Sequence, residues 1–255
     1  EHSGRSAANA YYILSVDVGR KGCDSVVCVF KVTPQAQGPA IKSLVNIYTF
    51  ADEHFEDQAI RIKKLYYKYK ARTIVIDGNG LGIGLVDYMI KSQEDENGDF
   101  FPDFGVENDD EGYYKKYRTA NTEFDAMYIL KANAPINTEC HANAQTQLQA
   151  GKVKFLIDER GAKEKLLATK MGQNMKPEER AEYLKPFTLT SILKEEMMNL
   201  REENEGVNII LKQANRGIRK DKFSAFEYGL YYIKQEEDKK KKKKKFNAAD
   251  WAFFN

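Results

Sequence analysis

The chain has 255 residues, of which 42% are hydrophobic and 31% are charged, and its 40 basic and 38 acidic side chains leave a formal net charge of +2. This length and composition suit one large domain or two small ones, and so small a net charge does not by itself indicate nucleic-acid binding. We find no signal peptide and no apolar stretch of the roughly 18 residues that span a bilayer, so we expect neither secretion nor a membrane segment.

The first half of the chain predicts a sheet. Residues 1–10 are small and polar and are expected to form a linker or a remnant of one. Apolar runs rich in β-branched residues, joined by short turns, then predict an antiparallel meander of three strands. A helix and a fourth strand follow, and a crossover helix allows that strand to lie parallel in the same sheet. The expected ranges are 11–18, 25–32 and 40–50 for the meander, 55–70 for the helix, 73–77 for the fourth strand and 85–90 for a second helix.

The second half is mostly helical by pattern. Residues 92–118 are polar, acidic and aromatic, and predict a surface loop or a small hairpin. We expect helices at 122–132, 135–150, 163–171, 189–204 and 221–235, short strands at 152–157 and 207–213, and a charged segment flanked by prolines at 175–185. The simplest interpretation is one mixed α/β domain over 11–235.

The end of the chain is strongly charged. Seven consecutive lysines, Lys239–Lys245, lie within the expected Lys-rich tail 236–255. Such a run repels itself and is typical of a solvated tail, although it also suits the binding of nucleic-acid phosphates.

Two aspartates stand in unusual places, each in or at the end of an apolar run that predicts a buried strand. Asp17 lies in Ser-Val-Asp-Val-Gly, and Asp77 lies in Val-Ile-Asp-Gly. A lone buried carboxylate costs several kcal/mol unless it is paired, so two of them suggest a shared cation. Each also has a plainer interpretation, because Asp17 can bond to the following turn and Asp77 can belong to a simple Asp-Gly turn.

A third candidate, Asp221, stands at the expected start of the last helix, where aspartate is also a good N-cap. Basic residues crowd it, as a phosphodiester-binding site requires and an N-cap does not. Because the three histidines are scattered and the three cysteines lack metal-ligand spacing, Asp and Glu must carry any metal chemistry, which favours Mg²⁺ or Mn²⁺.

The glycine-rich stretch 78–84 gives only a weak nucleotide signal. It does not match the G-x-G-x-x-G fingerprint and lacks the Lys and Ser/Thr of a Walker A motif. A nucleotide-binding protein is therefore disfavoured. As a strand-to-helix turn beside Asp77, the stretch would let the backbone approach a phosphate closely.

Together, three stretches resemble the C-terminal nuclease domain of tailed-phage large terminase subunits. They are Ser-Val-Asp-Val-Gly around Asp17, Val-Ile-Asp-Gly-Asn-Gly-Leu-Gly-Ile-Gly-Leu-Val-Asp around Asp77, and Arg-Lys-Asp-Lys-Phe-Ser-Ala-Phe-Glu-Tyr-Gly around Asp221. The resemblance implies an α/β fold of the RNase H/integrase type, with about five core strands, the first three antiparallel, flanked by helices. It also implies an endonuclease that cuts concatemeric viral DNA during genome packaging with two Mg²⁺ or Mn²⁺ ions.

The same resemblance implies roles for individual residues. Asp17 would bridge both metals, Asp77 would hold one, and Asp221 the other. Some relatives have an additional acidic or histidine ligand near the third position, where this chain has Lys222. The expected DNA-backbone contacts are the basic residues near the aspartates: Arg20, Lys21, Arg216, Arg219, Lys220 and Lys222.

The implied partners are double-stranded DNA, the family's ATPase domain (absent from this chain), the small terminase subunit and the portal, all in the host-cell cytoplasm. Three alternatives stay open. A Holliday-junction resolvase or an RNase H would use the same fold on other substrates, and a non-catalytic nucleic-acid-binding module would use the carboxylates structurally.

Overall fold

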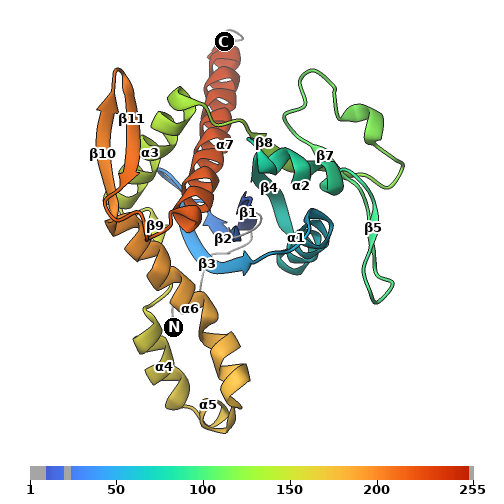
Figure 1. Ribbon diagram of the computed structural model, residues 1–255. Coiled ribbons are helices and arrows are strands. Elements are labelled where there is room, and N and C mark those ends of the chain that lie inside the picture. The colour runs from blue at the N-terminus through green and yellow to red at the C-terminus, as the bar shows by residue number, and fades with distance from the viewer. Residues whose placement is uncertain (1–9, 20–23, 253–255) are drawn as a thin grey trace.

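A seven-stranded mixed sheet with helices on both faces forms the centre of the molecule (Figure 1). The computed structural model describes residues 10–19 and 24–252, and side chains in these ranges as far as residue 242. The predicted linker 1–10 therefore lies almost wholly outside the described residues. The strand order is β7-β8-β4-β1-β2-β3-β9.

The predicted meander is confirmed. β1 (Tyr11–Asp17), β2 (Ser25–Thr33) and β3 (Ile41–Phe50) pair antiparallel in chain order. β4 (Ala71–Asp77) lies parallel to β1, as the crossover helix predicted. Parallel pairs extend the sheet at both ends, through β8 (Glu123–Leu130) and β7 (Phe104–Val106) on one side and β9 (Val153–Lys154) on the other.

The two faces of the sheet bury separate cores, because side chains alternate along each strand. Leu14 and Val16 face the core under α1 (Phe55–Tyr69) and α2 (Leu81–Met89). Ile13 faces the other core, which α3 (Ala134–Gln149), α6 (Pro177–Met198) and α7 (Asp221–Ala252) cover. The approach of α7 is close, since a Cβ at Gly229 would lie 2.6 Å from the Phe30 ring.

The predicted helix at 122–132 is wrong. This segment forms β8, which lies inside the sheet between β4 and the edge strand β7. Ala126 and Met127 are fully buried, and Ile129 and Leu130 nearly so. A strand buried on both faces has a nearly continuous apolar run, which the pattern alone does not separate from a buried helix.

The predicted helix at 189–204 is wrong beyond residue 198. The chain turns there into a hairpin, β10 (Leu200–Glu205) and β11 (Asn208–Gln213), around Gly206 with its positive φ of 62°. The segment 175–185 proves to be the first half of α6, which begins at Pro177, a favourable first helical residue.

Smaller elements complete the chain. Residues 92–118 contain the hairpin that they predicted, β5 (Gln93–Glu94) with β6 (Phe100–Phe101), followed by β7 and a short 3₁₀ turn at Lys115–Tyr117. α4 (Glu159–Leu167), α5 (Lys170–Asn174) and the start of α6 extend away from the sheet around a small core of their own (Figure 1). No helix among the described residues is both long and apolar enough to cross a bilayer.

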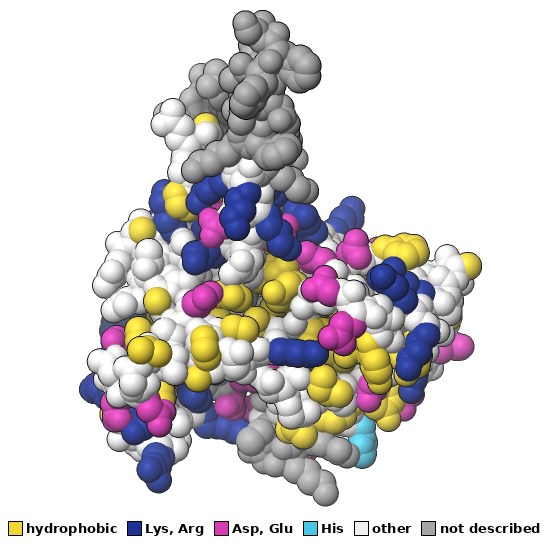
Figure 2. Space-filling view, turned by 90° about the horizontal axis from the view of Figure 1, so that it is seen from above, with side chains coloured by type: hydrophobic (Ala, Val, Ile, Leu, Met, Phe, Trp, Pro, Cys, Tyr) yellow, Lys and Arg dark blue, Asp and Glu magenta, His cyan; other side chains and the backbone are white. Residues whose placement is uncertain are grey.

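The last helix is longer than predicted. α7 does not end at 235 but continues through the lysine run to Ala252, so the boundary expected at 236 is not the end of an element. Lys239 pairs with Glu236 and Glu107, and Lys241 pairs with Asp238. Figure 2 shows lysine and arginine side chains gathered on part of one face, so the small net charge is unevenly distributed.

Candidate metal and nucleic-acid site

Two of the three predicted aspartates end neighbouring parallel strands. Asp17 is the last residue of β1 and Asp77 the last of β4. The register pairs Val16 with Ile76, so the next residue on each strand is one of these aspartates, and they lie side by side at the same edge of the sheet. Both are partly buried, and the Asp77 carboxylate also accepts a hydrogen bond from the Asn79 amide at 3.0 Å.

α7 brings the third aspartate to this edge. Asp221, Ala225, Tyr228 and Tyr232 recur at helical spacing and share one face of α7. The Tyr232 hydroxyl donates to Thr73 Oγ1 on β4 at 3.1 Å, so this face lies over the sheet near β4. Further along α7, the Lys240 ammonium lies 5.3 Å from the centre of the Tyr11 ring at the start of β1. The first residue of α7 therefore approaches the carboxyl ends of the strands.

The electrostatics reflect this convergence. Burial, together with the negative charges of Asp221 and Asp77, raises the pKa of Asp17 from 3.8 to about 7. Burial also raises the pKa of Asp77, although its hydrogen bonds from Asn79 oppose the rise. A bound cation would relieve the repulsion that the other two carboxylates exert on Asp17, and carboxylate oxygens are what Mg²⁺ and Mn²⁺ prefer.

The donor set therefore fits a hard divalent ion, but the carboxylates do not form a closed cage. Within the described part of the chain, no group of three or more His, Cys, Asp and Glu side chains has the arrangement of a metal site. Asp221 Oδ2 instead forms an ion pair with Arg219 Nε, at 2.9 Å.

The predicted DNA-binding residues divide into four groups. Lys220 is exposed, and its charge lowers the pKa of Asp17, so it lies near the aspartates; Arg216 is exposed in the turn before α7. Arg219 pairs with Asp221. Lys222 does not fit the expected role, because it is buried and its ammonium lies 3.2 Å from Glu196 Oε1. Arg20 and Lys21 lie outside the described residues.

The glycine turn beside Asp77 has a packing role. A Cβ at Gly82 would lie 1.5 Å from the Asp77 carbonyl oxygen, and one at Gly78 would lie 2.3 Å from Ile129 Cγ2. Gly80 has a positive φ of 52°. These glycines let α2 start directly against the end of β4, and so they fix the backbone that carries Asp77.

Two acidic residues near the site were missed from the sequence. Glu196 on α6 is 1% exposed and bonds to the first turn of α7. Glu227, on α7 beyond Asp221, is 3% exposed and contacts His141 Nδ1 at 2.6 Å. Neither gave a sequence signal, because each is one of many acidic residues in a helical stretch and its burial depends on a distant helix.

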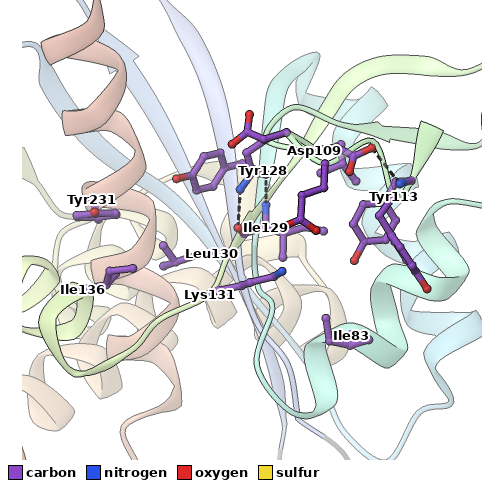
Figure 3. A pocket seen from close by; sticks show the side chains of 14 residues that line it. Ile83, Asp109, Tyr113, Tyr128, Ile129, Leu130, Lys131, Ile136 and Tyr231 are labelled. Atoms are coloured by element: carbon purple, nitrogen blue, oxygen red, sulfur yellow. Dashed lines mark hydrogen bonds between the residues drawn. The ribbon is translucent and has the colours of Figure 1, made fainter.

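An acidic pocket of about 570 Å³ lies on the β8 side of the strand ends (Figure 3). Its lining includes Leu130, which pairs with Asp77, and the loop residues Asp109, Asp110 and Glu111. Asn108 anchors this loop by two hydrogen bonds to the Ile129 backbone. Exposed charge near the aspartates is thus basic before α7 and acidic beyond β8.

No protein-family model matches this chain, and no curated protein matches it. Solved structures do. The large terminase nuclease of thermophilic phage G20c with bound magnesium is 13% identical over 88% of this chain and 82% of its own, with a TM-score of 0.50. A second structure of that nuclease is 14% identical with the same coverage and a TM-score of 0.48. The large terminase nuclease domain of Thermus phage P74-26 is 13% identical over 88% of this chain and 79% of its own, with a TM-score of 0.45.

At this level of identity, the likeness to the magnesium-bound nuclease concerns the fold. The mixed sheet flanked by helices, expected from the resemblance of three short stretches, is confirmed. This chain has the fold of the phage G20c large terminase nuclease.

Proposed function

We propose that this chain is the nuclease of a phage large terminase, a metal-dependent endonuclease that cuts concatemeric viral DNA during genome packaging. The observation that carries the proposal is the approach of Asp17, Asp77 and Asp221 at one edge of this fold, where their charges raise the pKa of Asp17. The magnesium in the G20c nuclease supports a divalent cation here.

In this proposal the three aspartates hold Mg²⁺ or Mn²⁺, with Asp17 shared by two ions. When bound, such ions activate water and stabilise the negative charge of a phosphodiester under attack. Asp17 must be ionised to bind a cation, so cation binding should strengthen as the pH rises through about 7. Lys220 and Arg216 supply positive charge for the DNA backbone, which favours binding without sequence preference.

The proposed substrate is double-stranded DNA. The proposed partners are the terminase ATPase domain, the small terminase subunit and the portal, in the cytoplasm of the infected host. Since phosphate contacts carry little sequence information, these partners would select the cut site.

Plasmid digestion tests the proposal. Wild type, Asp17→Asn, Asp77→Asn and Asp221→Asn are compared in Mg²⁺, Mn²⁺, Ca²⁺ and EDTA, with the exposed Asp87→Asn on α2 as a matched control. We expect cutting by wild type and the control in Mg²⁺ or Mn²⁺ and none by the three site variants. Equal activity of Asp17→Asn and wild type would refute the proposal. If a four-way junction or an RNA–DNA hybrid were cut faster than plasmid, that nucleic acid would be the substrate in place of double-stranded DNA.

A further inference from the structure

We propose that Glu196 is a positioning residue that fixes Asp221 at the metal site and holds the Lys222 ammonium away from it. This inference rests on the proposed function. It assigns a role to a buried acidic residue that is itself no metal ligand, because both of its carboxylate oxygens are already bonded to the first turn of α7.

The contacts of Glu196 are specific. It lies in the last turns of α6, and its Oε2 accepts a hydrogen bond from the Phe223 amide at 2.9 Å. Its Oε1 lies 3.2 Å from Lys222 Nζ. The first amides of a helix have no partner within the helix, and here a carboxylate from another helix supplies one. Both bonded groups directly follow Asp221 in the chain.

These contacts fix the start of α7 relative to the sheet. The Cys28 thiol on β2 donates to the Lys222 carbonyl at 3.8 Å, so α6 and β2 hold the same turn from two sides. Glu196 is also close enough to Asp17 for its negative charge to contribute to the high pKa there. The third carboxylate thus owes its place partly to a residue 25 positions earlier in the chain.

Lys222 makes this arrangement necessary. If the Lys222 ammonium pointed toward Asp221, its positive charge would repel a divalent cation there. Glu196 neutralises this charge inside the protein, and Lys222 is 8% exposed. Apolar residues could fill the same volume without the cost of burying two charges, so packing alone does not explain the pair.

Isothermal titration of Mn²⁺ into the DNA-free protein tests the inference without measuring activity. Replacing residues that orient metal ligands typically costs 10- to 100-fold in affinity, so we expect Glu196→Gln to weaken Mn²⁺ binding by about 10-fold or more. Exposed Glu195→Gln, one residue earlier on α6, is the matched control and should bind like wild type. Wild-type affinity in Glu196→Gln would overturn the inference.

Double variants separate the two parts of the role and avoid an unpaired buried lysine. In Glu196→Gln/Lys222→Met the amide oxygen can still accept from Phe223 and no ammonium is left, so Mn²⁺ affinity should recover. In Glu196→Ala/Lys222→Met the acceptor is lost, and binding should stay weak. Wild-type affinity in the alanine pair would overturn positioning, and no recovery in the glutamine pair would overturn the part played by the ammonium.

The two proposals fail differently. If wild type binds no Mn²⁺ and cuts no DNA, the proposed function is wrong. If wild type binds and cuts, Asp17→Asn does neither and the alanine pair binds like wild type, only the role of Glu196 is wrong.

Discussion

Replacing Asp17 with asparagine should stabilise the metal-free protein at high pH, although it removes a proposed metal ligand. Burial and the charges of Asp221 and Asp77 raise the pKa of Asp17 from 3.8 to about 7. The folded protein therefore holds this proton more tightly than the unfolded chain does. As the pH rises from about 4 to about 7, the unfolded chain binds fewer protons than the folded protein, and the free energy of unfolding falls.

The size of the effect follows from the two pKa values. A difference of about three units corresponds to about 4 kcal/mol, at roughly 1.4 kcal/mol per unit. Part of this loss is complete by pH 5, which leaves about 2 to 3 kcal/mol to develop between about pH 5 and pH 8. Asp17 is partly exposed, and solvent screening lowers the expected value to about 2 kcal/mol. Asparagine is uncharged throughout and avoids this loss.

Urea denaturation in EDTA at pH 5 and pH 8 measures this loss of stability, with Asp87→Asn as the control. Asp17→Asn should gain about 2 kcal/mol on wild type between the two pH values, and the control should gain nothing. If the difference in free energy of unfolding between Asp17→Asn and wild type were the same at both pH values, Asp17 would not titrate as a crowded carboxylate. With Mg²⁺ present, wild type should gain stability by mass action and Asp17→Asn should gain little.

Three further changes probe the surroundings of the site. Gly229→Ala places a methyl group against a buried phenylalanine ring and should lower the free energy of unfolding in urea by about 1 to 3 kcal/mol. An unchanged free energy of unfolding would show that α7 shifts to make room for the methyl group. Lys220→Gln should reduce the slope of log affinity against log salt for DNA by about 1 in fluorescence anisotropy, and an unchanged slope would remove Lys220 from the interface. Asp110→Asn should tighten DNA binding severalfold at low salt without changing Mn²⁺ affinity, whereas weaker binding would mean that the acidic pocket contacts DNA directly.

The early strands were predictable because local patterns determine them. The apolar runs at 11–18 and 25–32 alternate between two buried faces, and short turns leave them no pairing but an antiparallel one. The prediction for β8 was wrong for the opposite reason, since a strand with neighbours on both sides and helices on both faces loses the alternation of apolar and polar residues. Only its partners β4 and β7, from other parts of the chain, decide its structure.

The site divides in the same way. Asp17 and Asp77 could be placed together from the sequence, because parallel neighbouring strands end at one edge of a sheet. The approach of Asp221 was less evident, because α7 is buried on nearly every side between Lys222 and Ile233 and its apolar pattern does not single out the face that meets the sheet. The docking of α7 against the sheet and α3, which depends on distant parts of the chain, therefore decides where this aspartate lies.

Glu196 could not be found in this way, and the reason is physical. Its neighbours on α6 are as acidic as it is, and only the docking of α6 against α7 distinguishes it from the exposed Glu195. Lys222 beside Asp221 gives no hint either, because its burial, which is what demands a counter-charge, is visible only in the fold. A buried cation next to a proposed cation site therefore predicts a buried carboxylate somewhere else in the fold, and the structure identifies it as Glu196.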